Sequence, residues 1–232
     1  MQQQKPFLAG ILFLLAGLSA CDSTEIGDSK DVNQDKIYMD YHIACEEATD
    51  HVVLNFKYRF AGSAGTTLVL NDPSQVELDG KKLAVDSTEF AGAYYEVEKK
   101  ISQYTGKHLV SFTDFAGKKW DNGFDIAPIQ LDPLPATADK KKDLVIAYST
   151  VSMGANDYAE ISSSGTDSSF RYEQQGPAKS ITIPVKELKR QKGKSFFVTC
   201  TFYKEIALSQ TASEGGRLKM TYKLRPVKIK LQ

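Results

Sequence analysis

Val52-Val53-Leu54-Asn55-Phe56-Lys57-Tyr58-Arg59-Phe60-Ala61 places an apolar side chain at every even position, and three of the five odd positions between them are polar. Because neighbouring side chains of a β-strand point to opposite faces, this period of two predicts a strand with one buried face and one wet face. Strands of this kind are typical of antiparallel sheets that cover a core on one side only. The stretch therefore predicts an all-β chain.

Shorter runs of the same kind follow at 67–70, 75–78, 82–85, 93–99, 108–113 and 119–126. Asp79-Gly80 lies between two of these runs and predicts a tight hairpin turn, since glycine adopts positive φ without strain. Residues 115–117 and Asp121-Asn122-Gly123 are interpreted as further turns. No amphipathic helix interrupts the pattern apart from one helical turn expected at 185–190, so the spacing indicates β-sandwich architecture.

A change of composition divides the chain at 131–140, where Pro133 and Pro135 fix φ and remove two donors that a sheet would need. We therefore expect two tandem antiparallel β-sandwich domains, at 35–132 and 143–232, with a linker at 133–142. The expected strands of the second domain are 144–151, 159–163, 169–172, 180–185, 195–208 and 217–231.

The last of these strands contains an irregularity. Its apolar side chains occupy even positions from Leu218 to Leu224 and odd positions from Val227 to Leu231. A change of parity turns the apolar set to the other face unless the chain bulges, bends or crosses to another sheet. We predict a kink at Pro226.

The first twenty residues have the layout of a secretory signal peptide, with Lys5 before an apolar core at 7–17. The core is too short to cross a bilayer, which needs roughly 20 apolar residues. Leu18-Ser19-Ala20-Cys21 resembles the box that the lipoprotein signal peptidase reads. This resemblance implies that Cys21 carries a thioether-linked diacylglyceryl group and becomes the mature N-terminus. An ordinary cleaved signal with an incidental cysteine is the alternative.

A lipid on Cys21 would hold the protein at the cell envelope, with the outer membrane favoured and its periplasmic or surface side left open. Residues 21–34 are polar and rich in turn formers, so we expect a flexible, disordered tether. Asp22-Ser23-Thr24-Glu25 resembles the surface-export signal of lipoproteins from the Bacteroidota. A solvated flexible linker without any export signal explains the same residues equally well.

A second resemblance concerns the globular part. The order of Lys179-Ser180-Ile181-Thr182-Ile183-Pro184, Leu188, Gly193 and a long aromatic-rich strand looks like the closing part of immunoglobulin-like domains in uncharacterised Bacteroidota lipoproteins. The opening Asp35-Lys36-Ile37-Tyr38-Met39-Asp40-Tyr41 is similar to the start of such proteins. The resemblance covers residues 31–232 and implies two immunoglobulin-like sandwiches, but it implies no established activity. A clear Cys…Trp…Cys arrangement is lacking, which argues against a true antibody-type domain.

The charges balance, with 29 Lys and Arg against 29 Asp and Glu. Such a chain offers no clustered positive field for a polyanion, which argues against nucleic acid as a partner. Strand parity puts Cys45 and Cys200 on buried faces, and we expect two unreactive thiols in separate cores rather than a disulfide.

No arrangement of residues predicts catalysis or a cofactor. A Gly-x-Ser-x-Gly elbow is missing, and Ser63 lies in an expected hairpin loop. His42, His51 and His108 lack the spacing of metal ligands. Asp114 and the 121–123 segment carry oxygens that suit calcium, but they are interpreted as turn residues because the full spacing of a calcium loop is missing.

Aromatic side chains offer one candidate binding residue. Trp120 shares parity with Phe124 and points to the core, whereas Tyr94 shares a face with Glu96 and Glu98 and is expected to face solvent. The leading hypothesis is a noncatalytic, lipid-anchored envelope protein for adhesion, assembly or ligand capture, with an envelope protein or a glycan as partner. The alternative is a glycan-binding accessory lipoprotein of a polysaccharide-uptake system, centred on Tyr94. A hydrolase with a site scattered in the sequence is a third hypothesis.

Overall fold

The structure is a computed structural model that describes residues 24–164 and 168–232. The predicted signal peptide and Cys21 therefore lie outside the described residues. Within these ranges the chain forms eighteen β-strands, one short α-helix and four single-turn 3-10 helices. The prediction of an all-β chain is confirmed.

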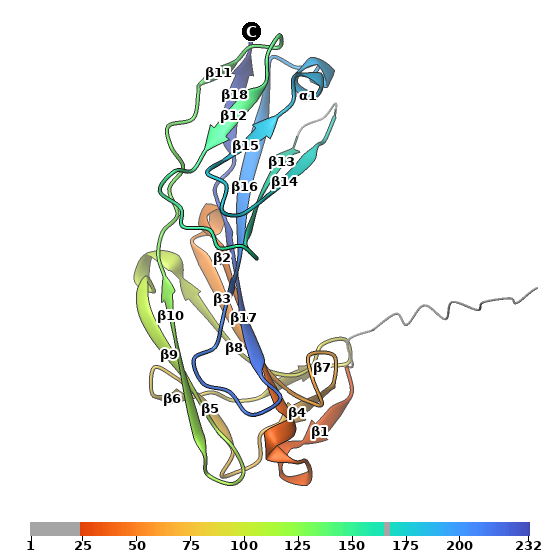
Figure 1. The fold of residues 1–232 in the computed structure, drawn as a ribbon, viewed down its shortest axis with the longest axis vertical. Coiled ribbons are helices and arrows are strands. Elements are labelled where there is room, and N and C mark those ends of the chain that lie inside the picture. The colour runs from red at the N-terminus through yellow and green to blue at the C-terminus, as the bar shows by residue number, and fades with distance from the viewer. Residues whose placement is uncertain (1–23, 165–167) are drawn as a thin grey trace, which may run out of the picture.

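The strands form two lobes, one above the other in Figure 1. The lower lobe contains β1 (Ile26–Asp28), β2 (Ile37–Glu46), β3 (His51–Phe60), β4 (Thr66–Val69), β5 (Gln75–Leu78), β6 (Lys81–Lys82), β7 (Asp86–Thr88), β8 (Gly92–Lys100), β9 (Gly106–Thr113) and β10 (Lys119–Ile126). The upper lobe contains β11 (Thr137–Ala138), β12 (Leu144–Ala147), β13 (Tyr158–Ser164), β14 (Arg171–Gln175), β15 (Ser180–Ile183), α1 (Val185–Arg190) and β18 (Val227–Leu231). Two further strands, β16 (Ser195–Ile206) and β17 (Gly216–Lys223), join the lobes.

One sheet of twelve strands runs through both lobes, with the order β1-β4-β3-β2-β17-β16-β13-β14 along its main path. A second layer of β10-β9-β5-β6 covers it in the lower lobe, and β12-β15 form a separate two-stranded sheet in the upper lobe. Tyr58 of β3 meets Phe112 of β9 across the lower layers, with ring centroids 4.3 Å apart. Both residues are fully buried, so the core lies between the layers.

The hairpin of β16 and β17 passes from one lobe into the other. The first part of β16 pairs with β13 and β18, and its end pairs with β17. In turn β17 runs parallel to β2 over eight residues, from Gly216 opposite Met39 to Lys223 opposite Glu46. Residues 216–223 therefore complete the sheet of the lower lobe, although the proline-rich break had assigned them to the second domain. Inside the expected linker, β11 pairs with β18.

The change of parity near Pro226 corresponds to a bulge. Thr201 faces Lys223 and Val198 faces Val227, so two residues of β16 oppose three residues on the other strand. The extra residue lets Leu224 and Ile229 both stay buried despite their opposite parity. At this point the chain leaves β17, beside β2, and continues as β18, beside β11. The predicted kink is confirmed.

The start of the chain corrects the predicted tether. Residues 26–28 form β1, which pairs in parallel with β4, and the Thr67 amide donates to the Glu25 carbonyl at 2.9 Å. Ser29 is fully buried, and its hydroxyl accepts a hydrogen bond from the Asn71 amide at 2.9 Å. The expected disorder over 21–34 is therefore wrong from residue 26 onward, because an edge strand is held by backbone hydrogen bonds that composition does not report.

The expected turns have different outcomes. Asp79-Gly80 is confirmed as a two-residue hairpin turn with positive φ at both positions, 51° and 77°. The Lys118 amide donates to Asp114 Oδ1 at 2.8 Å, which confirms turn chemistry there. Asp121-Asn122-Gly123, however, lies inside β10, where every residue pairs with β9. Asn122 is 1% exposed and holds Gln210 through two hydrogen bonds, so it connects elements rather than turning the chain.

The described cysteines are free and buried, as predicted. Burial raises the pKa of each thiol, Cys45 and Cys200, to about 12. They do not lie in separate cores, however, because both belong to one continuous cluster of buried side chains. Tyr222 pairs with Cys45 on one side and with Phe202 on the other, so two strand spacings of about 4.8 Å separate the two cysteine strands.

Candidate functional site

The strongest candidate site lies on the outer face of the shared sheet. The alternation that buries Met39, Tyr41 and Ile43 in β2 turns Tyr38, Asp40 and His42 outward. The same alternation places the side chains of five residues of β3 and β17 on the outer face of the sheet: Asn55, Lys57, Arg59, Arg217 and Lys219. Together the charged and polar members surround a hollow of about 210 Å³, which we call the basic hollow: Asp40, His42, Asn55, Lys57, Arg59, Arg217 and Lys219.

Asp40 fixes two guanidinium groups in this hollow. Arg217 Nε donates to Asp40 Oδ1 at 2.7 Å, and its Nη2 donates to Oδ2 at 3.2 Å. Arg59 Nε donates to the same Oδ2 at 3.4 Å, and its Nη1 donates to the Gly65 carbonyl at 3.1 Å. Arg59 is only 4% exposed, although it is charged. Forked hydrogen bonds to a carboxylate hold arginine in a defined geometry, so this part of the hollow is preorganised.

His42 stands at the centre of the same face. Its Nε2 lies 3.4 Å from the Thr221 hydroxyl on β17. Burial lowers the pKa of the imidazole, and the nearby charges of Lys219, Lys57 and Arg217 lower it further, against the opposing effect of Asp40. The ring is therefore expected to be neutral at pH 7, and it offers one donor and one acceptor to a ligand.

A second hollow of about 340 Å³ adjoins the first and shares His42 and Lys219 with it. We call it the tyrosine hollow, and its other lining residues are Asn156, Tyr158, Tyr203, Lys204, Glu205, Met220 and Thr221. Tyr158 of β13 and Tyr203 of β16 pair across the sheet and stack with ring centroids 4.3 Å apart. The basic hollow and the tyrosine hollow together form what we call the sheet-face groove.

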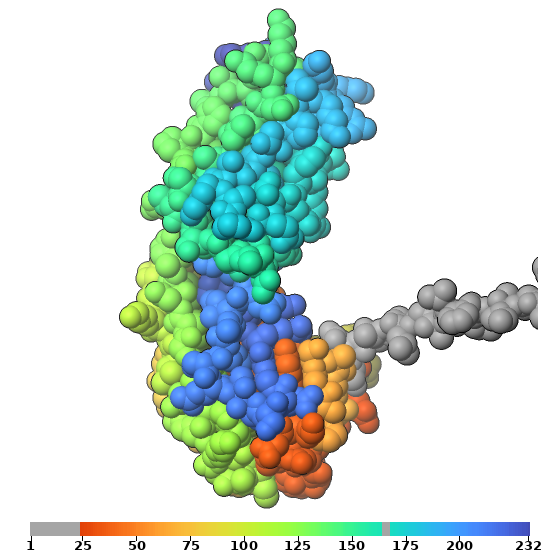
Figure 2. All heavy atoms as spheres, viewed as in Figure 1, coloured from red at the N-terminus to blue at the C-terminus, as the bar shows by residue number. Residues whose placement is uncertain are grey.

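The tyrosine hollow lies where the lobes meet. Asn156 belongs to a loop of the upper lobe, and Asp157 beside it accepts hydrogen bonds from the Gly154 and Glu205 amides at 2.7 and 3.0 Å. That carboxylate thereby ties the loop to β16. Figure 2 shows the body bent, with a hollowed side between the lobes, and the blue atoms of the β16–β17 region exposed below the upper lobe. Both lobes therefore contribute to the sheet-face groove.

The site residues predicted from the sequence do not line the groove. Tyr94 is half-buried on the outer face of β8, with Lys57 Nζ 6.0 Å from its ring centroid, so it borders the basic hollow without lining it. Cys21 lies outside the described residues. Tyr158 and Tyr203 were not predicted as site residues, although Tyr158 shares outward parity with Glu160, and Tyr203 shares it with Glu205. What parity does not show is that β13 and β16 are neighbours.

The histidines remain apart from one another. His51 lies 3.3 Å from Glu98 at the end of β3, and His108 Nδ1 lies 2.9 Å from Asp79 Oδ2 with Tyr104 stacked on its ring at 3.8 Å. Over 24–164 and 168–232, no group of three His, Cys, Asp or Glu side chains is placed to hold a metal ion. None of the helices in these ranges is long and apolar enough to span a membrane. Trp120 is 4% exposed, so its predicted core position is confirmed.

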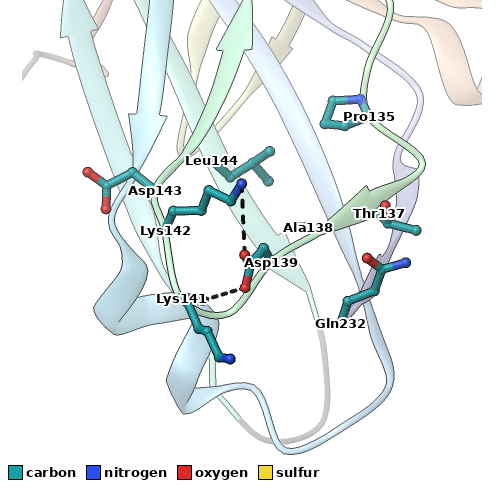
Figure 3. A pocket seen from close by; sticks show the side chains of 9 residues that line it. All are labelled: Pro135, Thr137, Ala138, Asp139, Lys141, Lys142, Asp143, Leu144 and Gln232. Carbon is teal, nitrogen blue, oxygen red and sulfur yellow. Dashed lines mark hydrogen bonds and ion pairs between the residues drawn. The ribbon is translucent and has the colours of Figure 1, made fainter.

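A larger hollow of about 520 Å³ opens at the far end of the upper lobe, shown in Figure 3. Asp139 closes its turn by accepting a hydrogen bond from the Lys141 amide at 2.8 Å, with Lys142 Nζ 3.9 Å away. In the close-up, the side chain of Asp143 points away from Pro135 and Gln232 on the opposite wall. Polar and charged residues line most of this hollow, but none of the lining residues is aromatic, and the hollow belongs to the upper lobe alone. The sheet-face groove is therefore the better candidate.

The sequence matches no protein-family profile and no curated protein. Among solved structures it is similar to SGBP-B from the mixed-linkage glucan utilization locus of Bacteroides ovatus, in complex with a mixed-linkage heptasaccharide. The identity is 12%, the match covers 89% of this chain and 66% of that one, and the TM-score is 0.26. This chain thus spans just under two thirds of that protein.

Two further similarities are to proteins described as tandem immunoglobulin domains. DIP-gamma IG1+IG2 has 9% identity over 85% of this chain and 98% of that one, with a TM-score of 0.24. The tandem titin domains have 11% identity over 84% of this chain and 94% of that one, with a TM-score of 0.23. Superpositions this loose carry no information about function, which has to come from the site itself.

Proposed function

We propose that this chain is a noncatalytic binding protein, held at the cell envelope by a lipid on Cys21, which captures a ligand in the sheet-face groove. The observation that carries the proposal is the groove itself. The two adjoining hollows are lined by polar, charged and aromatic side chains, which come from both lobes and lie on one open face of the sheet. Ligand sites commonly combine a concave surface with a few fixed polar groups and aromatic walls, and often lie between domains.

A glycan is the ligand class that the tyrosine hollow favours. The apolar face of a pyranose ring packs on aromatic rings, and its hydroxyl groups need donors and acceptors around them. Tyr158 and Tyr203 supply half-buried rings, while Asn156, Thr221 and His42 supply polar groups nearby. Adhesion to an envelope protein through the same face is the other use of the groove.

The test is affinity electrophoresis of the purified protein in gels that contain neutral or acidic polysaccharides. We expect Tyr203→Ala to weaken retardation by at least tenfold, because one stacking ring is lost from the groove. Tyr94→Ala is the matched control, since this tyrosine lies on the same face but lines neither hollow. Its loss is expected to change binding less than threefold.

Two results would count against this proposal. Loss of binding on Tyr94→Ala with Tyr203→Ala unaffected would move the site to the edge of β8. Release of shorter sugars from any polysaccharide of the panel by the protein alone would show catalysis and contradict a purely binding role.

A further inference from the structure

The folded part of the lower lobe begins very close in the sequence to the proposed lipid. The Thr67 amide donates to the Glu25 carbonyl at 2.9 Å, and β1 pairs with β4 from Ile26 onward. Four peptide bonds separate Cys21 from Glu25. Because four fully extended residues span at most about 14 Å, a lipid on Cys21 would keep Glu25 within that distance of the lipid headgroups. Part of the lower lobe therefore has to lie beside the bilayer.

Thr67 shows which part this is, because it connects the start of the chain to the β7–β8 hairpin. Its hydroxyl donates to the Glu25 carbonyl at 2.8 Å and accepts from the Ala93 amide at 2.8 Å. Gly92 has a φ of 70°, and a Cβ at this position would clash with the same hydroxyl, so glycine is needed for this close approach. In Figure 1, β7 lies beside the residues at which the described chain begins. We call this region the N-terminal corner: Glu25, Ile26, Thr67 and residues 88–92.

The N-terminal corner presents a large apolar side chain to solvent. Phe90 lies at the tip of the hairpin, between the end of β7 and the start of β8, and it is 90% exposed. Ile26 on β1 is 46% exposed. A single exposed apolar residue needs no explanation by itself. Here, however, it lies on the corner that the anchor would hold beside the lipid, and phenylalanine is among the residues that proteins bury at the boundary between headgroups and acyl chains.

The charges of the hairpin decide which kind of lipid surface it fits. Asp86 and Glu89 are exposed on the hairpin, and Lys57 of β3 reaches it, where its Nζ donates to the Ala91 carbonyl at 3.1 Å. Charged groups of both signs thus lie around Phe90. We therefore expect the contact to depend on the apolar ring rather than on attraction to headgroups of one sign, so that zwitterionic lipids suffice.

We propose that the N-terminal corner is a membrane-contact surface. The short chain behind Cys21 holds this corner against the bilayer, and the ring of Phe90 inserts among the lipid headgroups. The contact rests on the proposed function, because the lipid on Cys21 is what brings the corner to the bilayer. It adds a second attachment, made by the folded protein itself, and fixes which side of the lower lobe faces the membrane.

The test introduces a tryptophan at the hairpin tip and measures its contact with lipid. The full mature protein with Phe90→Trp, carrying its lipid, is reconstituted into phosphatidylcholine vesicles in which part of the lipid is brominated on its acyl chains, because bromine quenches tryptophan at short range. Trp120 is the one native tryptophan and is 4% exposed, so wild-type protein supplies the background. We expect the emission added by Phe90→Trp to fall at least twofold in brominated vesicles.

Leu109→Trp is the matched control. Leu109 is also exposed, at 43%, but it lies on β9 in the layer that covers the other side of the lower core. Its added emission is expected to change by less than a tenth. Because both positions are exposed, neither substitution should disturb the core. Equal quenching in the two variants would show nonspecific contact with lipid and overturn the N-terminal corner as the contact surface.

The anchor and the contact fail in different ways. Protein that floats with the vesicles while Phe90→Trp stays unquenched would overturn the contact and leave the anchor standing. Mature protein that does not float with the vesicles would overturn both, and ligand capture in the sheet-face groove would still stand. Quenching confined to vesicles that contain phosphatidylglycerol would show attraction to anionic headgroups and contradict the insertion of an apolar ring.

Discussion

Replacing Cys21 with Ala is expected to abolish the incorporation of labelled fatty acid into the protein completely. The proposed anchor is a pair of acyl chains on this one sulfur, and no other residue can take its place in the Leu18-Ser19-Ala20-Cys21 box. Each buried methylene contributes about 0.8 kcal/mol to membrane binding, and two chains suffice for stable anchoring. The expected effect is therefore all or none. The measurement is metabolic labelling with a palmitate analogue, followed by detection of the label on the purified protein.

Cys45→Ala is the matched control for this prediction, because it also removes a cysteine but one that is only 2% exposed within the core. It is expected to keep the full label. Label that persists in Cys21→Ala would contradict the anchor, and label lost from both variants would point to failed export instead. Mass spectrometry of the mature N-terminus checks the same prediction, since an unmodified first residue would exclude lipidation.

Tyr58→Ala is expected to lower the free energy of unfolding by about 3–5 kcal/mol, the usual cost of removing a large buried aromatic side chain. Tyr58 is fully buried between the two layers of the lower lobe. Its ring lies 4.3 Å from Phe112 and 6.0 Å from both Tyr41 and Tyr95, and its hydroxyl lies 3.3 Å from that of Tyr41. One substitution therefore removes contacts with β2, β8 and β9 together.

Urea unfolding followed by circular dichroism measures this loss. Phe90→Ala is the control, because Phe90 is a comparable aromatic side chain that is 90% exposed at the turn between β7 and β8. A surface change of this kind is expected to stay within about 0.5 kcal/mol of wild type. Similar losses in the two variants would contradict the packing described for the lower lobe.

The sequence reports local features of this fold well. Alternation along β2, β3 and β10 depends on which face is buried, and a strand carries that information in its own residues. For this reason the positions of Trp120 and Cys45 were predictable, and so was the irregularity at Pro226. Asp79-Gly80 is another local signal, which predicts a hairpin turn because few residue pairs adopt positive φ at two successive positions.

The residues of a single strand do not identify the distant strand with which it pairs. Nothing within residues 216–223 distinguishes a strand of the second lobe from one that lies beside β2, because both positions need the same alternation. The proline-rich break at 131–140 marks one crossing between the lobes, but the β16–β17 hairpin makes two more. The domain division read from composition therefore placed β17 with the wrong neighbours.

The same limit applies to the candidate site. Parity turns Tyr158, Tyr203, Lys57 and Lys219 outward, which is all that the sequence shows about them. Their convergence depends on the order β3-β2-β17-β16-β13, and that order follows from long-range pairing. Tyr94 was predicted from its parity with Glu96 and Glu98 within one strand, whereas the groove lies where strands of the two lobes meet.

Hydrogen–deuterium exchange tests the central claim most directly, because it locates the ligand without any substitution; the ligand is an oligosaccharide of the polysaccharide that retards the protein in affinity gels. A ligand in the sheet-face groove is expected to slow exchange in β2, β16 and β17, and to leave β9 and β10 of the opposite layer unchanged. Slower exchange confined to β9 and β10, or to the far end of the upper lobe around 135–144, would contradict the claim that the shared sheet face is the binding site.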